Sequence, residues 1–305
     1  MSDRISVNGT LTSPAEAAVS PLDRGFLFGD SVYETIRTYG GRPFRLRQHL
    51  ERLRRSADEL GIALDRAPVD VEQEIGRALA AAANPESAVR VVLSRGVGPI
   101  GYDPEPCGPP TVVVYVRPCP LIPEGWHREG VDVAIVRVTR NAVSAVDPAI
   151  KSSNLLNNFL AWKEARPLGV FEPILLSPEG RLAEGASSNV FLVRGGSLLT
   201  PGLETGILRG ITRDLALELA RGGGLPVSEE ALGPDDLRRA EEAFLTSTLK
   251  GILPIRRCDG WPVHDGRPGP VTLRLLELFD AVVRAETAEA QGETKTGSLP
   301  GSTLR

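Results

Sequence analysis

Cysteine and histidine are scarce in this chain of 305 residues, which contains three of each. The cysteines, Cys107, Cys119 and Cys258, are too few and too scattered for a disulfide framework or a Cys-x-x-Cys metal site. The histidines also lack the spacing of metal ligands. These absences argue against structural zinc and against a Cys–His nucleophile pair. We therefore expect any demanding chemistry to require an organic cofactor.

Long apolar runs and basic runs are also missing. No segment approaches the roughly 18 consecutive apolar residues of a membrane-spanning helix. The N-terminal segment MSDRISVNGT lacks the apolar core of a signal peptide, so the sequence predicts a cytoplasmic protein that does not contact membranes. The net charge is −4 and no stripe of basic residues is present, which argues against nucleic acid as a partner.

Lysine is rare among the 35 basic residues, because arginine takes almost every such position. The lysines are Lys151, Lys163, Lys250 and Lys295. An arginine stays protonated in a protein, whereas a lysine amine can lose its proton and attack carbonyl groups or pyridoxal phosphate. Lys151 precedes Ser152, Ser153 and Asn154, which are typical helix N-caps, so the pattern places it just before a helix. The positive end of the helix dipole would favour the neutral amine there, which makes Lys151 the candidate nucleophile.

The alternation of strand-like and helix-like segments predicts an α/β (α+β) fold of two domains. A proline-rich stretch follows the last strand-like run of the first half and is typical of a linker. We expect domains at residues 1–118 and 129–282, joined by a linker at 119–128. Residues 283–305 are polar and rich in small residues, which predicts a disordered tail.

Two segments of the first half carry polar residues with alternative interpretations. Residues 32–39 alternate as in a strand and place Tyr33, Thr35 and Arg37 on one face. Such a face fits the wall of a site or a solvated face of a sheet. Arg52 lies on a predicted amphipathic helix at 46–60, about 120° from its apolar stripe. This spacing is typical of a solvated arginine.

The second half has two comparable segments. Glu184 lies in the small-residue run EGASSN, and the local pattern favours a turn carboxylate over one that faces a site. Gly206 and Gly210 precede a predicted helix at 212–220. Free backbone N–H groups at such a helix start could bind a phosphate group, although the Gly-Lys-Ser/Thr of a Walker loop is absent.

Taken in order, these motifs resemble those of the fold-type IV (class IV) pyridoxal-phosphate aminotransferases, over about residues 5–282. The matching motifs are GDSVYETIR (29–37), HLERL (49–53), IKSSN (150–154), EGASSNV (184–190), GILRGITR (206–213) and TST (246–248). The family includes branched-chain aminotransferases, D-amino-acid aminotransferases and aminodeoxychorismate lyase. The resemblance implies two domains with pyridoxal 5'-phosphate between them, usually in a homodimer whose partner contributes to the site.

The resemblance also implies residue roles. Lys151 matches the lysine that binds the cofactor covalently and then moves the substrate's α-proton. Glu184 matches the carboxylate that pairs with the pyridine nitrogen, and Arg52 matches an arginine on the cofactor phosphate, contrary to its spacing. The remaining implied contacts are Ile211, Thr212 and Thr248 for the phosphate, and Tyr33, Arg37, Ile100 and Tyr102 for the substrate.

The motifs favour a transaminase that moves the amino group of branched-chain L-amino acids to a 2-oxo acid such as 2-oxoglutarate. The loop at 94–103 resembles the D-amino-acid and lyase branches, but Ile100 replaces their carboxylate-binding arginine. Residues 33–39 resemble the branched-chain segment, whereas Leu156 stands where those enzymes usually have a tyrosine. Aminodeoxychorismate lyase and a D-amino-acid aminotransferase are the alternatives. A catalytically idle binder of pyridoxal phosphate is a further one, against which the pair Lys151 and Glu184 argues.

Overall fold

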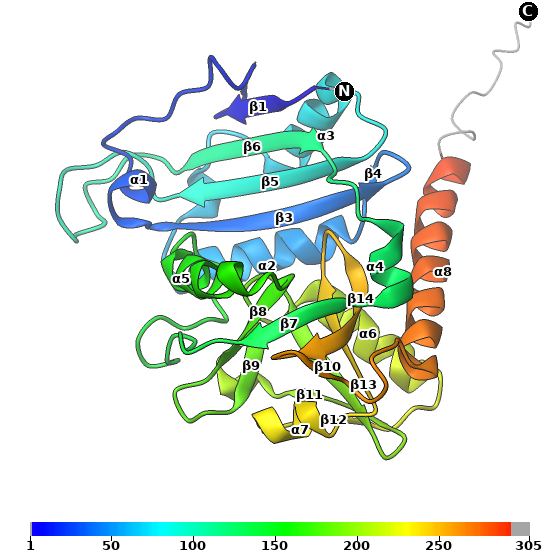
Figure 1. Cartoon of the computed structure of the whole chain (residues 1–305). Helices are drawn as coiled ribbons and strands as arrows, with labels where there is room; N and C mark the ends of the chain where they lie inside the picture. The colour runs from blue at the N-terminus through cyan, green and yellow to red at the C-terminus, as the bar shows by residue number, and fades with distance from the viewer. Residues whose placement is uncertain (1, 294–305) are drawn as a thin grey trace, which may run out of the picture.

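The structure, a computed structural model, describes residues 2–293. Two β-sheets organise the chain, one with six strands and one with nine. Figure 1 shows them in separate halves, with the first sheet in the upper half and the second in the lower half. The predicted mixed fold of helices and strands is confirmed.

The first sheet has the strand order β2-β1-β6-β5-β3-β4. Its strands are β1 (Arg4–Val7), β2 (Thr10–Thr12), β3 (Ser31–Tyr39), β4 (Arg42–Pro43), β5 (Ser87–Ser94) and β6 (Thr111–Pro118). The helices of this half are α1 (Arg24–Phe28), α2 (Leu46–Glu59) and α3 (Val71–Ala82), with a 3₁₀ turn at Leu64–Arg66. Because side chains alternate along a strand, Val32 and Ile36 of β3 pack with Leu53 of α2 and Ile75 of α3 in one core. The opposite face of β3 is left for the second half.

The second sheet has the order β12-β11-β10-β13-β14-β7-β8-β9, and β15 pairs with β14. Its strands are β7 (Val131–Ile135), β8 (Glu172–Leu176), β9 (Leu182–Gly185), β10 (Asn189–Arg194), β11 (Ser197–Pro201), β12 (Val227–Glu230), β13 (Glu242–Ser247), β14 (Gly251–Cys258) and β15 (Trp261–Pro262). The helices are α4 (Glu124–Glu129), α5 (Leu156–Ala165), α6 (Ile211–Gly222), α7 (Pro234–Arg238) and α8 (Pro270–Glu293), with 3₁₀ turns at Arg166–Leu168 and Leu203–Thr205.

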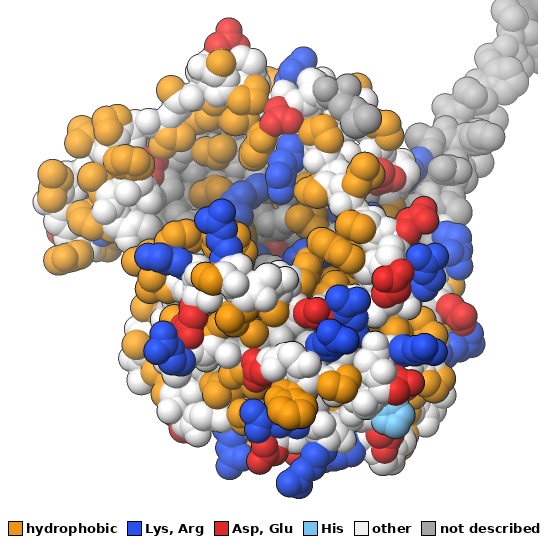
Figure 2. All heavy atoms as spheres, in the orientation of Figure 1, with side chains coloured by type: hydrophobic (Ala, Val, Ile, Leu, Met, Phe, Trp, Pro, Cys, Tyr) orange, Lys and Arg blue, Asp and Glu red, His pale blue; other side chains and the backbone are white. Residues whose placement is uncertain are grey.

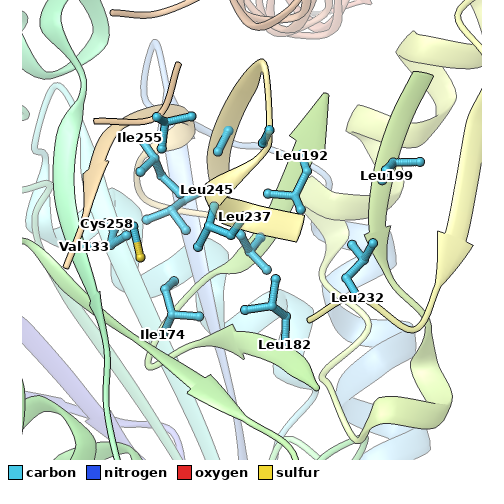
Figure 3. Packing of buried hydrophobic residues seen from close by; sticks show 14 of the residues in the cluster. Val133, Ile174, Leu182, Leu192, Leu199, Leu232, Leu237, Leu245, Ile255 and Cys258 are labelled. Atoms are coloured by element: carbon cyan, nitrogen blue, oxygen red, sulfur yellow. The ribbon is translucent and has the colours of Figure 1, made fainter. Parts of the chain in front are cut away.

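Both faces of the second sheet are buried. On one face Ile174, Leu182 and Leu245 belong to a single apolar cluster, which Figure 3 shows from close by. On the other face Phe191 and Phe244 stack with their ring centroids 4.8 Å apart, in the cluster that includes α6 and α8. Sheets covered on both faces carry nearly continuous apolar strands, as β10 does with Val-Phe-Leu-Val at 190–193.

The predicted disordered tail is wrong for residues 283–293, because α8 continues through them to Glu293. Leu275, Phe279 and Val283 recur every four residues and are buried against the second sheet and α6. The carboxylate of Glu286 lies 2.9 Å from the Arg45 guanidinium of the first half. Figure 1 shows α8 along one side of the molecule. The rest of the predicted tail, 294–305, lies outside the described residues.

The predicted linker at 119–128 contains most of the short helix α4. Trp126 of this helix packs edge-on against Phe171, with ring centroids 4.7 Å apart. The first sheet uses residues 4–118 and the second uses residues 131–262. The sheets thus lie on either side of the linker, while the division into domains stays a prediction.

Within residues 2–293, no helix is long and apolar enough to cross a membrane. The same part of the chain holds no cluster of His, Cys, Asp and Glu residues that could bind a metal ion. The three cysteines are free. The cytoplasmic location stays a prediction from the sequence.

Candidate active site

A cavity of about 330 Å³ is lined by residues of both halves. Figure 2 shows the surface hollowed between the upper and lower halves of the molecule. The lining residues include Tyr33, Thr35, Arg52 and Arg90 from the first half, and Arg140, Lys151, Glu184, Ser187, Ser188, Asn189, Leu208, Gly210, Ile211, Thr212, Thr246, Thr248, Leu249 and Lys250 from the second.

Lys151 belongs to the second half, but its backbone is held by the first. Its N–H donates to Ser56 Oγ of α2 at 3.1 Å, and its carbonyl accepts from the Tyr33 N–H of β3 at 2.9 Å. Val32 and Ser152 form an antiparallel bridge beside it. The amine Nζ lies 4.5 Å from the centre of the Tyr33 ring, on the cavity wall. The predicted nucleophile is therefore fixed in the cavity through its main chain.

The predicted capping of the following helix is wrong. Helix α5 begins at Leu156, and its N-cap is Leu155 with no side-chain capping bond. The residues after Lys151 do not enter the helix because they are extended against the start of β3. A helix dipole acts mainly within the first turn. Its effect on Lys151 stays a prediction.

Glu184 lies in β9 and is buried, so the turn carboxylate that its local pattern favoured is wrong. Its Oε1 lies 2.8 Å from Nε of Arg140, and its Oε2 accepts from the Leu208 N–H at 3.0 Å and from Asn189 Nδ2 at 3.2 Å. Burial raises the pKa of Glu184, while Arg140 and the Leu208 amide act in the opposite direction. The site thus has a carboxylate whose charge depends on cationic neighbours.

Arg52 is also buried, so the solvated position that its spacing indicated is wrong. Its Nε lies 2.6 Å from Glu34 Oε1, its Nη2 donates to Glu34 Oε2 at 2.9 Å, and its Nη1 donates to the Arg209 carbonyl at 2.9 Å. His49 Nδ1 lies 2.7 Å from Glu34 Oε2. Burial alone would raise the pKa of Glu34, but Arg52 and His49 outweigh it and lower the pKa to about 2. An ionised glutamate therefore holds Arg52 at the cavity.

The start of α6 adds backbone donors to the same wall. Its N-cap is Gly210, and no side chain caps the first turn. A Cβ at Gly210 would lie 2.1 Å from Asn189 Oδ1, so a larger residue cannot take this position without displacing Asn189. The first N–H groups of a helix have no partners within it and attract anions. Together with Arg52 and Thr248, Ile211 and Thr212 form an arrangement suited to a phosphate group.

Three of the residues that sequence resemblance connects with the substrate lie outside the cavity of their own chain. Arg37 does not line it, and its Nη1 donates to the Leu249 carbonyl at 2.6 Å. Ile100 and Tyr102 lie on the loop after β5, with 77% and 88% of their surface exposed. The structure does bring Tyr33, Arg52, Lys151, Glu184, Ile211, Thr212 and Thr248 together.

Sequence reasoning missed Glu34, His49, Arg140 and Arg90. A signal existed for the first two: Glu34 occupies an inward position of β3 between Val32 and Ile36, and His49 precedes Arg52 by three residues on one helix face. Arg140 lies 44 residues before Glu184, the residue that it pairs with. Because the chain is rich in arginine, no local pattern distinguishes Arg140 from the others.

The model of the Amino-transferase class IV family matches residues 31–258. The chain belongs to this family and is an aminotransferase of this class, as its motifs predicted. It is 38% identical over 276 residues to a Methanocaldococcus jannaschii protein provisionally named a branched-chain-amino-acid aminotransferase, with 90% of this chain and 95% of the relative covered. It is 35% identical over 291 residues to D-alanine aminotransferase of Staphylococcus aureus, with 93% and 99% covered.

Solved structures show the same fold. Branched-chain amino acid aminotransferase of Escherichia coli matches with a TM-score of 0.86 and 30% identity, covering 93% of this chain and 95% of that one. A branched-chain amino acid aminotransferase from T.th. with pyridoxamine 5'-phosphate matches with a TM-score of 0.88 and 30% identity, covering 96% and 97%. These matches show similarity of fold and sequence. The substrates in their names are those of the matched proteins.

The buried His49 predicts how stability depends on pH. Burial lowers the pKa of His49 below its ordinary 6.5, although Glu34 raises it. The unfolded chain therefore takes up a proton as the pH falls through 6.5 while the folded chain resists it, so stability present above that pH is lost below it. We expect the Tm from calorimetry to fall as the pH is lowered from neutral through this range. In His49→Gln that slope should be flatter.

Exposed His264 provides the matched control, and His264→Gln should keep the slope of the parent protein. Ionisation of Glu34 does not enter this range, because its ordinary pKa is 4.5 and its folded value is about 2. Equal slopes for His49→Gln and the parent would contradict the assignment of a neutral buried imidazole.

Proposed function

We propose that this aminotransferase binds pyridoxal 5'-phosphate between its two halves and transfers the amino group of branched-chain L-amino acids to a 2-oxo acid such as 2-oxoglutarate. The observation that carries this proposal is one cavity that contains a lysine held by its main chain, a buried carboxylate and an uncapped helix start beside a buried arginine. Each group alone has structural explanations, but the combination matches one cofactor.

The lining residues fit that cofactor by their chemistry. The phosphate would be held by Arg52, Thr248 and the N–H groups of Ile211 and Thr212. Buried hydroxyls of Ser188 and Thr246 also lie on the wall and have no partner among the described residues. Glu184 would pair with the pyridine nitrogen. When bound, the cofactor supplies an electron-withdrawing ring that makes the proton on the substrate's α-carbon acidic.

The residues of the chain supply position and proton transfer. Lys151 Nζ would take the proton from the α-carbon of the amino acid and, for the acceptor acid, return it. Burial raises the pKa of Glu184, and Arg140 opposes that effect and so favours the charged carboxylate. Tyr33 lies beside the lysine amine, with Nζ 4.5 Å from the centre of its ring.

Arg90 supports a dicarboxylic acceptor. It lies on β5 opposite Thr35, lines the cavity, and its Cζ is 3.9 Å from the centre of the Tyr33 ring. No carboxylate pairs with it within the described part of the chain. A guanidinium forms a bidentate pair with a carboxylate, so Arg90 is available for the second carboxylate of 2-oxoglutarate or glutamate.

The choice of branched-chain L-amino acids rests on three points. Ile100 stands where the D-amino-acid enzymes carry a carboxylate-binding arginine. Residues 33–39 resemble the corresponding segment of branched-chain enzymes. Relatives and solved structures are named as branched-chain aminotransferases. Leu156, which departs from the branched-chain pattern, does not line the cavity. The similarity to a D-alanine aminotransferase keeps that activity as the second candidate. These similarities do not favour aminodeoxychorismate lyase.

A half-reaction screen tests the substrate. The protein loaded with cofactor is mixed with single amino acids, and loss of the visible absorption band of the bound cofactor is followed. L-Leucine, L-isoleucine, L-valine and L-glutamate should react roughly 100-fold faster than D-alanine. Lys151→Ala should slow the reaction by at least about 1,000-fold, since it removes the proton-transfer group. The exposed Lys163 gives the control Lys163→Ala, which should retain the parent rate.

Faster reaction with D-alanine would assign the D-amino-acid activity instead. Release of pyruvate from 4-amino-4-deoxychorismate without an acceptor acid would assign the lyase. Full activity of Lys151→Ala would refute the role of this lysine.

We also propose a homodimer. Phe26 of α1 and the loop residues Ile100 and Tyr102 expose large apolar side chains, and the ring centroid of Tyr102 lies 5.8 Å from that of Phe28 in α1. Arg24 keeps this loop in place, since its Nη1 donates to the Asp103 carbonyl at 2.8 Å and its Nε lies 3.2 Å from Asp30. An ordered loop with exposed apolar side chains suits a second copy, where it would reach the partner's cavity.

Light scattering should therefore give a mass about twice 32.7 kDa. A charge at the exposed loop, in Tyr102→Asp, should shift the population toward the single chain and raise the KM for the amino acid. A parent protein that has the mass of one chain at all concentrations would contradict the dimer.

A further inference from the structure

We propose that Glu172 is a positioning residue that holds the amine of Lys250 in an ion pair and so keeps this second lysine of the cavity from reacting with the cofactor aldehyde. This inference rests on the proposed function, because it requires pyridoxal 5'-phosphate in the cavity. Glu172 itself does not line the cavity, so it acts through Lys250.

Lys151 and Lys250 both line the cavity, but their amines have different surroundings. Within residues 2–293, no carboxylate lies within 4.0 Å of the Lys151 Nζ, and its amine makes no hydrogen bond. The Lys250 amine donates to Ser187 Oγ at 3.3 Å and lies 3.7 Å from Glu172 Oε2. One amine is therefore unpaired and the other is paired.

The carboxylate of Glu172 is buried beside the cavity wall. Glu172 is the first residue of β8, with 4% of its side chain exposed. Its Oε1 accepts from the Ser187 N–H at 2.5 Å and from Ser187 Oγ at 3.0 Å. Burial of a carboxylate costs free energy unless donors and an opposite charge offset it. In the described part of the chain, the Lys250 ammonium is the one cation within 4.0 Å of Glu172, so each group of this pair stabilises the other.

Aromatic and backbone contacts also restrain Lys250. Its Nζ lies 4.8 Å from the centre of the Phe171 ring, and Trp126 packs edge-on against that ring. The face of an aromatic ring attracts a cation. The Lys250 carbonyl lies 3.2 Å from His127 Nε2 of α4, so the main chain is held as well. The amine is therefore kept at the part of the wall where Glu172 and Ser187 lie.

The ion pair matters because only an unprotonated amine reacts with an aldehyde. In that reaction the amine nitrogen bonds to the aldehyde carbon, and the aldehyde oxygen leaves as water with the two amine protons. Contact with a carboxylate favours the ammonium, which is not a nucleophile. Burial does not protect Lys250, since 25% of its side chain is exposed. What distinguishes it from Lys151 is the pair with Glu172.

Glu172→Gln tests this, because it keeps one oxygen for Ser187 and replaces the other with an NH₂ group. An NH₂ group cannot accept from the Lys250 amine, so the amine is released. The protein loaded with pyridoxal 5'-phosphate is reduced with borohydride and digested, and mass spectrometry locates the pyridoxyl groups. We expect the share on Lys250 to rise from below about 1% in the parent to about 10% or more in Glu172→Gln.

The Lys151→Ala background removes the competing amine and gives a second measurement. After addition of pyridoxal 5'-phosphate, the visible band of the bound cofactor should develop at least about tenfold faster in Lys151→Ala/Glu172→Gln than in Lys151→Ala. Adding Lys250→Arg should abolish this gain, since arginine stays protonated.

Glu277→Gln is the matched control. Glu277 lies on α8 with 69% of its side chain exposed, and this variant should carry its pyridoxyl group on Lys151 as the parent does. If Glu172→Gln does not fold, Ser187→Ala carries the test, because it removes the other contact of the amine. The share on Lys250 should then rise by about threefold or more.

Pyridoxyl groups confined to Lys151 in Glu172→Gln and Ser187→Ala would overturn the proposal and leave the proposed function standing. A pyridoxyl group on Lys250 of the parent would overturn it as well, because the pair would not restrain the amine. Spread of the groups to the exposed Lys163 would do the same, since it would show a general loss of structure. A parent protein without a pyridoxyl group on any lysine would overturn the proposed function and this inference with it.

Discussion

The site depends on the hydrogen bonds between the segment around Lys151 and the start of β3. The Lys151 carbonyl accepts from Tyr33, its N–H donates to Ser56 of α2, and Ser153 N–H donates to the Ser31 carbonyl at 2.9 Å. A segment of the second half thus extends the first sheet. Without this pairing the lysine would belong to a free loop between β7 and α5. With it, the candidate nucleophile and one wall of the cavity are fixed in place.

Buried charged residues near the Lys151 segment position the other side chains of the site. Transfer of a charged group out of water is costly, and a nearby opposite charge with additional hydrogen bonds offsets the cost. Glu34 pairs with Arg52 and His49, and Glu184 pairs with Arg140. Apolar residues would stabilise a core as well as such pairs do. The pairs instead hold the Arg52 guanidinium and the Glu184 carboxylate at one cavity. Folding does not require this placement, whereas ligand binding does.

Features that depend on neighbouring residues in the sequence could be predicted from the sequence. The 3.6-residue period of α2, the alternation of β3 and the position of Lys151 outside a helix could be found from sequence, and the ordered motifs identified the family. The partners of Glu184 and the contact of Arg37 could not, since they join segments 44 and 212 residues apart. The solvated interpretation of Arg52 failed because helical periodicity identifies an apolar stripe but not a buried glutamate on a neighbouring strand. The helix over residues 283–293 was missed because a polar composition rich in small residues does not by itself distinguish the end of a helix from a tail.

The central claim is that Lys151 carries the cofactor, and the cavity contains a second lysine that makes the claim testable. Lys250 lines the same cavity, with its amine near Ser187 and Glu172. Borohydride reduction of the protein loaded with pyridoxal 5'-phosphate, followed by proteolysis and peptide mass spectrometry, shows which amine is bound. We predict one pyridoxyl group, on Lys151. A pyridoxyl group on Lys250 instead, or none on any lysine, would contradict the account.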